Sequence, residues 1–215
     1  MTDHEIFADD PRAALESIRS LAVGHLACLP TDTLYGIHGL ATFPGMVEKL
    51  AEAKGYELGE RGFILLVKDS AEIARWAELD EQSKSQIERY AGSPISFIFK
   101  ALPDTPPDWT TLTEEGEARI AFRTPDTPFL KELLGYLDAP LLSTSANEPG
   151  EPPLASAAEI VKLFGDAVDI VVSDPELETR VAEEGIVPST LVDLTCRPPR
   201  VLREGKVPFV MAAGA

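Results

Sequence analysis

The sequence predicts an α/β fold, a three-layer domain built around one sheet. Two observations predict it. Short apolar runs typical of buried strands alternate with amphipathic segments along the chain, and no internal repeat interrupts them. Several of these runs break abruptly into hydroxyl and amide side chains, as at residues 31–33 and 143–147. Because α/β proteins place ligand sites at strand ends, we expect one polar pocket there.

Length and composition fit a single soluble domain, which we expect to span residues 1–215. No apolar run approaches the roughly 20 residues of a membrane span. The acidic N-terminus lacks the basic and apolar regions of a signal peptide. We therefore expect a cytoplasmic protein that does not bind a membrane. The two cysteines, Cys28 and Cys196, fit a reducing compartment, and we expect them to be unpaired.

The net charge of −17 disfavours non-specific attraction to nucleic acid, which depends on many Lys and Arg contacts to phosphate. It leaves room for a local basic cleft. In so acidic a chain, clustered Lys and Arg side chains indicate a site for an anionic ligand.

The first half of the chain begins with Asp10 and Pro11, a cap residue followed by a proline that suits the first turn of a helix. Gly55 is a plausible C-cap for a second helix that Pro44 opens. Lys54 continues the apolar face of that helix at its end, where a lysine can point into a cleft. The expected elements are a helix at 10–22, a strand at 25–30, a helix at 44–54, a strand at 63–67, helices at 70–77 and 80–91, and a strand at 94–100.

The second half opens with residues 102–117, rich in Pro, Thr and acidic side chains, which we expect to form a long surface loop. Asp126 is the expected cap of a helix that runs to Leu137. Ser156 and Glu159 form a capping-box pattern before another helix. The expected strands are 118–123, 140–143, 168–172 and 189–194, with an edge strand at 200–203.

Several catalytic classes lack their motifs. The Walker phosphate loop and the Rossmann glycine pattern are absent. The three histidines do not form a metal-binding spacing with either cysteine, so we do not expect a zinc site. There is no Gly-x-Ser-x-Gly elbow, and Ser143 and Ser145 lack an evident histidine partner, so we do not expect an acyl-enzyme hydrolase.

Arg123 ends an apolar strand, where an unpaired charge is costly. Its partner is either one of the 36 acidic side chains or a ligand, since the planar guanidinium suits a carboxylate or a phosphate. Thr31 and Thr33 are either ligand contacts or turn residues that bond to their own backbone. Arg203 lies either where a strand leaves the sheet or on the plain surface.

The order of the motifs points to a family. They are Pro-Thr-Asp-Thr-Leu-Tyr-Gly at 30–36, a helix ending in Lys54, Arg-Gly-Phe-Ile-Leu at 61–65, Gly-Ser-Pro-Ile-Ser at 92–96, Ile-Ala-Phe-Arg at 120–123, Ser-Thr-Ser-Ala-Asn at 143–147, Ser-Thr-Leu-Val-Asp-Leu at 189–194 and Leu-Arg-Glu-Gly at 202–205. This series resembles the YrdC/YciO family, whose best-known members are threonylcarbamoyl-AMP synthases. The resemblance runs from about Leu21 to Gly205.

The resemblance implies a twisted mixed sheet with helices on both faces and a large positive cleft. It also implies a nucleotidyltransferase that converts L-threonine, bicarbonate and ATP, with Mg²⁺, into threonylcarbamoyl-AMP and pyrophosphate. That product feeds threonylcarbamoyladenosine modification of tRNA, so tRNA and other tRNA-modification proteins are possible partners.

By position, the resemblance assigns catalytic roles to Lys54 and Arg123. It implies that threonine is held by Thr33, Arg123 and Ser189. It implies that the nucleotide is held by Lys54, Arg61, Ser96, Ser143, Ser145, Asn147 and Arg203. It assigns no protein ligand to a metal.

The chain departs from the family pattern at two places. The usual Lys-x-Arg-Pro is here Lys54-Gly55-Tyr56-Glu57, so the missing guanidinium must come from Arg61 if it comes at all. One lost phosphate contact removes on the order of 1.5–3 kcal/mol. The usual Pro-Gly-Pro-x-Thr carries an added residue and ends in Ser96. A YciO-like paralogue that binds double-stranded RNA, or that uses another acceptor, is the alternative.

Overall fold

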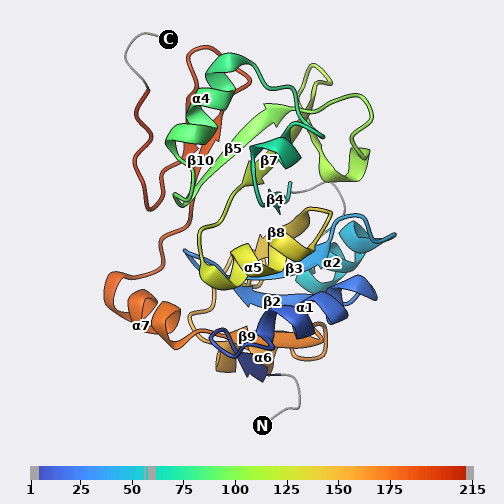
Figure 1. Ribbon diagram of the computed structural model, residues 1–215, viewed down its shortest axis with the longest axis vertical. Helices are drawn as coiled ribbons and strands as arrows, with labels where there is room; N and C mark the ends of the chain where they lie inside the picture. The colour runs from blue at the N-terminus through green and yellow to red at the C-terminus, as the bar shows by residue number, and fades with distance from the viewer. Residues whose placement is uncertain (1–4, 56, 58–61, 212–215) are drawn as a thin grey trace.

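The computed structural model describes residues 5–55, 57 and 62–211 (Figure 1). Within these residues, eleven strands form one sheet. The strands are β1 (Glu5–Phe7), β2 (Ala27–Pro30), β3 (Tyr35–Leu40), β4 (Ile64–Leu66), β5 (Ile95–Lys100), β6 (Thr111–Leu112), β7 (Ala118–Arg123), β8 (Leu141–Ser145), β9 (Ile170–Ser173), β10 (Thr190–Asp193) and β11 (Arg200–Arg203).

The helices are interspersed with the strands along the chain. They are α1 (Ala13–Ala22), α2 (Met46–Lys54), α3 (Ser70–Ile73), α4 (Glu81–Arg89), α5 (Pro128–Tyr136), α6 (Ala157–Phe164) and α7 (Pro175–Glu184), with a 3-10 turn η1 (Pro107–Trp109). Across the described ranges, no helix is long and apolar enough to cross a lipid bilayer.

The sheet mixes parallel and antiparallel pairs, which confirms the expected mixed α/β fold. Its strand order is β1-β9-β2-β3-β8-β4-β7-β5-β10-β11, with β6 attached to β7. Pairs such as β4–β7 and β5–β10 are parallel, whereas β3–β8 and β4–β8 are antiparallel. The expected edge strand at 200–203 is confirmed, since β11 closes one end of the sheet.

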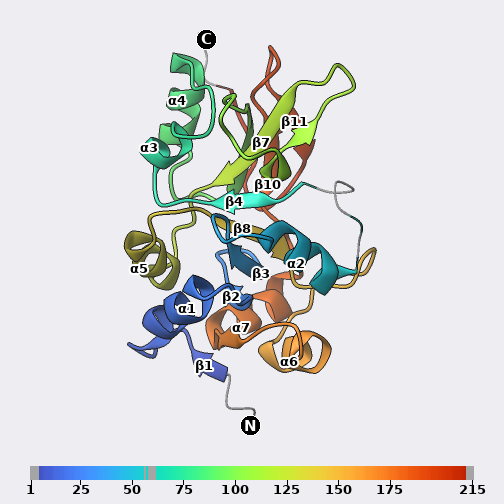
Figure 2. The same ribbon diagram turned by 90° about the vertical axis from the view of Figure 1, so that its right-hand side faces the viewer.

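Helices cover both faces of the half of the sheet that holds β2, β3, β8 and β9 (Figure 2). On one face, α1 and α5 pack against Leu29 and Leu141. On the other, α2, α6 and α7 pack against Ile37 and Leu142. The predicted three-layer arrangement is present in this half.

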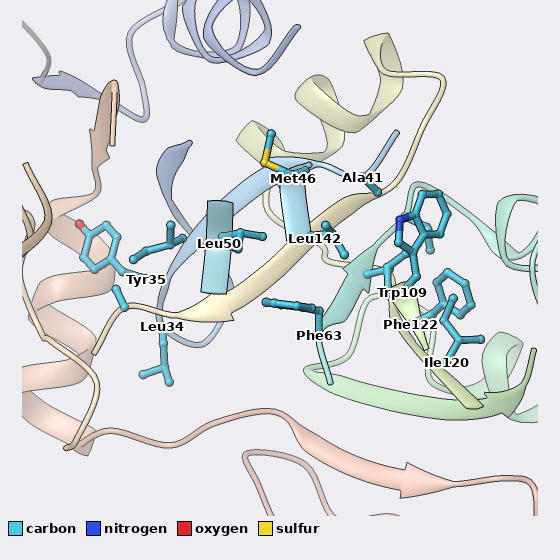
Figure 3. Close-up of a cluster of buried hydrophobic side chains, with 14 of the residues drawn as sticks. Leu34, Tyr35, Ala41, Met46, Leu50, Phe63, Trp109, Ile120, Phe122 and Leu142 are labelled. Atoms are coloured by element: carbon cyan, nitrogen blue, oxygen red, sulfur yellow. The ribbon is translucent and has the colours of Figure 1, made fainter. Parts of the chain in front are cut away.

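In the other half, α4 covers a face of β5 and β7 that presents aromatic side chains. Phe97, Phe99 and Phe122 form a chain of ring contacts 6.3 Å apart between centroids. This apolar cluster is continuous with the one beneath α2, as Figure 3 shows for Phe122 and Leu50. Successive side chains of a strand point to opposite faces, so the other face of these strands carries Ser96, Arg119 and Arg123 together with Ile98 and Ala121.

Several predicted boundaries were wrong. Asp10 does not cap α1 but accepts hydrogen bonds from Arg12, and the helix begins at Ala13. Thr127, not Asp126, caps α5, because its Oγ1 accepts from the Leu130 amide. The expected loop at 102–117 contains η1 and β6, and the side chain of Trp109 within it is buried.

Three further elements were missed altogether, β1, β3 and α7. The capping box at Ser156 and Glu159, the αL conformation of Gly55 and the free state of both cysteines are confirmed.

Candidate functional site

The site lies on the sheet face that α1 and α5 cover only in part. Along β8, Leu141 packs beneath α5, whereas Ser143 and Ser145 on the same face lie beyond that apolar cluster. Gly36 of β3 pairs with Ser145, and His38 pairs with Ser143. The uncovered ends of these strands therefore form the floor of a polar cavity, as the hydroxyl-rich strand ends predicted.

This cavity has a volume of about 220 Å³. Six of the predicted site residues line it: Thr33, Arg123, Ser143, Ser145, Ser189 and Arg203. They come from β7, β8, β11 and the turns before β3 and β10, so segments far apart in the chain converge here.

Gly36 lines the cavity at a place where there is little room for a side chain. A Cβ atom at this position would lie 2.7 Å from His38 Cε1 and 3.0 Å from the Thr144 carbonyl oxygen. The first contact is too short for a Cβ atom unless the buried His38 ring moves, so a glycine lets β3 lie against this side chain and the neighbouring strand without displacement.

Arg123 has a buried side chain with two kinds of partner. It donates to Thr33 Oγ1 at 3.0 Å and forms an ion pair with Asp32. The acidic partner that its position requires is thus present, and Arg123 also lines the cavity. Both interpretations of this arginine are compatible with the structure.

The turn before β3 is held by Thr31. Its Oγ1 donates to the Leu34 carbonyl at 2.7 Å and accepts from the Thr33 and Leu34 amides. Thr31 is therefore a turn residue that bonds to its own backbone. This turn fixes Thr33 so that its hydroxyl meets Arg123.

Arg203 and Ser189 form another wall of the cavity. Arg203 donates to the Ser189 carbonyl at 3.0 Å and to Ser189 Oγ at 3.1 Å. Ser96 is fully buried and lies 3.0 Å from Ser189 Oγ, so it contacts the cavity through Ser189 rather than lining it. Of the basic residues near the C-terminus, Arg197, Arg200 and Lys206 instead pair with acidic side chains.

Lys54 lies behind the cavity floor, with a buried ammonium group. It donates to the carbonyls of Ser145 and Asn147 and to Asn147 Oδ1. Asn147 Nδ2 donates to the Glu148 and Glu151 carbonyls. The structure thus brings Lys54 and Asn147 together, one layer behind Ser145, where they shape the turn after β8. Arg61 lies outside the described residues.

The electrostatic character of the cavity is positive. Its described lining residues include two arginines and no carboxylate. Burial, and secondarily the charge of Arg123, lower the pKa of Arg203. Two cations placed near one another in this way favour an anionic ligand. No group of three His, Cys, Asp or Glu side chains in the described part of the chain is arranged to hold a metal ion.

Sequence reasoning missed the histidine beside Ser143. His38 is fully buried, and its Nε2 lies 3.2 Å from Ser143 Oγ. Burial lowers the pKa of His38 to about 4, nearby main-chain groups partly oppose this, and the charge of Arg123 adds to it. The expectation that Ser143 lacks a histidine partner was wrong. The contact arises because β3 pairs with β8, and β3 was not predicted from the sequence.

Comparison with known proteins places this architecture among relatives. The family model described as "Telomere recombination", of the Sua5/YciO/YrdC type, matches residues 19–205. A protein of Enterobacter sp. (strain 638) named threonylcarbamoyl-AMP synthase is 32% identical over 148 residues, which cover 67% of this chain and 75% of that protein.

Two solved structures share the fold. The crystal structure of Escherichia coli YciO has a TM-score of 0.79 at 25% identity and covers 94% of each chain. Pyrococcus abyssi Sua5, solved in complex with L-threonine, also has a TM-score of 0.79, at 24% identity, over 94% of this chain and 56% of its own. The family match spans most of the sequence and agrees with the resemblance carried by its motifs. The chain belongs to the Sua5/YciO/YrdC family.

Proposed function

We propose that this protein is an L-threonylcarbamoyladenylate synthase, which forms threonylcarbamoyl-AMP and pyrophosphate from L-threonine, bicarbonate and ATP. The convergence of Arg123 and Arg203 with several hydroxyls on one cavity carries the proposal. The curated relatives named threonylcarbamoyl-AMP synthase support its standing as an enzyme of this kind. The Sua5 complex with L-threonine supports the amino-acid substrate.

In this proposal, the threonine carboxylate binds the Arg123 guanidinium, and Thr33 and Ser189 supply neighbouring hydroxyls. Arg203 and Ser143 bind the phosphates, and Ser145 does so when its hydroxyl, which donates to Asn147 Oδ1 at 2.6 Å, turns to the ligand. A cavity of about 220 Å³ is smaller than the roughly 300–1,000 Å³ of most ligand pockets. We therefore place the amino acid and phosphates inside it and the rest of the nucleotide beyond its mouth.

Lys54, Asn147 and Ser96 serve this chemistry from behind the lining residues. Lys54 and Asn147 fix the backbone at Ser145, and Ser96 fixes Ser189. A 1 Å displacement of a binding group is enough to impair an oriented reaction, so their loss weakens binding without removing a direct contact.

The reaction needs no covalent protein intermediate. The neutral threonine amine attacks the carbon of bicarbonate or CO₂ to form a carbamate; with bicarbonate a water is released, and with CO₂ the nitrogen loses a proton to solvent. A carbamate oxygen then attacks the α-phosphate, forming an O–P bond as the bond to pyrophosphate breaks. Negative charge accumulates on phosphate oxygens and leaving group, where fixed cations stabilise the transition state.

Mg²⁺ enters the proposal as part of the substrate. The described lining of the cavity offers no carboxylate ligand, and Asp32 nearby is paired with Arg123. Mg²⁺ in such sites is bound largely by substrate phosphates and water. In this proposal the ion enters bound to ATP, and no described residue of the cavity lining ligates it.

The same product feeds tRNA modification, which we propose as the role of the reaction, in the cytoplasm. Direct double-stranded RNA binding is the alternative, and the net charge of −17 opposes it. A different acceptor amino acid is a second alternative, because the nucleotide side of the cavity could be retained while the amino-acid side changed.

The test incubates purified protein with ATP, Mg²⁺, ¹³C-bicarbonate and each of several amino acids, followed by mass spectrometry. We expect an AMP adduct that contains threonine and one ¹³C atom. An adduct of another amino acid identifies a different acceptor. Absence of any adduct, together with salt-dependent retention on duplex RNA, contradicts the synthase and supports the RNA-binding alternative.

A further inference from the structure

We propose that His38 is a positioning residue for Ser143. In this proposal the neutral imidazole has its N–H at Nε2 and donates a hydrogen bond to Ser143 Oγ. The serine O–H is then available to donate a hydrogen bond to an anionic ligand in the cavity. The inference rests on the proposed function in one respect, that the ligand of this cavity is anionic.

The geometry of the sheet makes the pairing obligatory. His38 of β3 and Ser143 of β8 are direct partners in the antiparallel register, so their side chains leave the same face side by side. The distance from Nε2 to Oγ is 3.2 Å. The imidazole is fully buried, whereas Ser143 lines the cavity. Among the described side chains, Ser143 is thus the one that joins this histidine to the cavity by a hydrogen bond.

The position of the proton follows from the other ring nitrogen. His38 Nδ1 is buried and makes no hydrogen bond of ordinary geometry in the described part of the chain, although the main chain of Gly36 and Ala27 lies near enough to the imidazole to raise its pKa. A neutral imidazole has one N–H and one acceptor nitrogen. Orphaned buried N–H groups are rarer than under-satisfied acceptors. The tautomer with the proton on Nε2 therefore gives the N–H a partner in Ser143 and leaves only an acceptor unpaired.

This tautomer decides what Ser143 offers to a ligand. A serine hydroxyl has one donor and two acceptor sites. When His38 uses an acceptor site, the O–H remains available on the cavity side. It then donates to the same kind of oxygen that Arg123 and Arg203 attract, and all three groups are complementary to a carboxylate or a phosphate.

His38 is unsuited to act as a general base. A base must take up a proton, and full burial together with the nearby Arg123 charge disfavours the imidazolium. A positioning role predicts that the pH profile of turnover keeps its shape when His38 is replaced. A general base predicts that one limb of the profile disappears.

The tautomer can be measured directly in the wild-type protein. Nitrogen and carbon NMR shifts of ¹³C,¹⁵N-histidine-labelled protein distinguish the two neutral forms of each ring. We expect His38 in the Nε2–H form at pH 7 without ligand. The Nδ1–H form, or an imidazolium, overturns the proposal. Because this measurement needs no substrate, its outcome is independent of whether the protein is a synthase.

A double-mutant cycle then tests the link to the ligand. Calorimetry measures ATP affinity for wild type, Ser143→Ala, His38→Phe and the double variant. Loss of one hydrogen bond to a charged ligand predicts a roughly ten- to a hundredfold weaker affinity for Ser143→Ala. His38→Phe alone is expected to weaken binding, and to have no further effect once Ser143 is alanine. Losses that multiply overturn the proposal.

Controls separate positioning from folding. His25 lies outside the cavity and pairs with Asp169, so His25→Phe is expected to bind ATP as wild type does. His38→Gln retains an N–H donor and is expected to recover part of the affinity that His38→Phe loses. If His38→Phe fails to fold, His38→Leu, which also lacks the N–H donor, replaces it in the cycle. If the wild-type protein binds neither ATP nor threonine, the proposed function fails, while the NMR result still decides the tautomer.

Discussion

Arg123 and Asp32 form a buried ion pair in which each partner keeps one polar atom unpaired. Arg123 Nε and Asp32 Oδ2 are both without a hydrogen-bond partner among the described residues. A guanidinium commonly meets a carboxylate through two parallel hydrogen bonds. Here one nitrogen bonds to Asp32 and another to Thr33, so the guanidinium is held at the cavity wall from two directions.

This pair predicts a large coupling in stability. Arg123→Ala leaves Asp32 without its counter-ion, and removing one partner of a buried pair costs about 3 kcal/mol. Adding Asp32→Asn to Arg123→Ala removes the unpaired carboxylate charge, and this double variant is expected to recover most of the lost stability. Urea unfolding of the two single variants and the double variant measures the coupling. Additive losses contradict the proposed pairing.

Replacing Lys54 is expected to weaken nucleotide binding even though its side chain lies behind the cavity lining. Lys54→Ala frees the carbonyls of Ser145 and Asn147, so the turn after β8 loses its fixed shape. We expect ATP affinity to fall roughly tenfold or more, with a smaller change in threonine affinity. Calorimetry with each ligand makes the comparison.

The matched control for Lys54 is on the same helix. Lys49 donates to the Gly24 carbonyl at 2.6 Å, away from the cavity. Lys49→Ala is expected to leave ATP affinity unchanged. Equal ATP affinity in the Lys54 variant and the wild type removes Lys54 from the site.

His38 predicts an acid-sensitive stability. Its pKa is lowered from 6.5 to about 4 by burial, so the unfolded chain binds a proton between these pH values and the folded chain does not. The stability that the folded chain has with a neutral His38 is therefore fully present above pH 6.5 and is lost progressively as the pH falls toward 4. Between pH 7 and pH 5 this costs about 2 kcal/mol.

Comparison with His38→Gln measures that contribution. Urea unfolding at pH 7 and pH 5 is expected to show a smaller stability loss in the glutamine variant than in the wild type. An equal loss in both proteins shows that other groups cause the acid sensitivity.

The altered Lys-x-Arg-Pro pattern predicts a gain of function. Tyr56→Arg restores the family arginine, which adds one charge-assisted contact to phosphate, and we expect higher synthase activity in a product assay. Unchanged activity indicates that Arg61 already supplies the guanidinium. Arg61→Ala then loses activity in the wild-type background.

Elements with strong local signals were predictable from sequence. The apolar run at 118–123 is β7, residue for residue, and Ser156 with Glu159 forms the expected capping box. β3 was missed because Tyr-Gly-Ile-His-Gly-Leu contains two glycines and a histidine, which weaken the apolar pattern. α7 was missed although Asp174 and Pro175 carry the cap and first-turn proline that signal a helix start.

The candidate site was predictable where a motif carries it, as at Arg123, Ser143 and Ser189. The partners of these residues were not, because they depend on strand pairing. His38 and Ser143 are 105 positions apart, and only the β3–β8 register makes them neighbours. Lys54 was expected in the cleft, yet its helix ends one layer behind, where backbone carbonyls receive its ammonium group.

The central claim is that Arg123 binds the amino-acid substrate of a synthase. Pyrophosphate release, measured with and without L-threonine in wild type, Arg123→Lys and the exposed control Arg75→Ala, tests it most directly. We predict threonine-dependent release in the wild type and the control, and its loss in Arg123→Lys, which keeps the charge but not the planar fork. Threonine-dependent release that persists in Arg123→Lys with an unchanged KM for threonine contradicts the account.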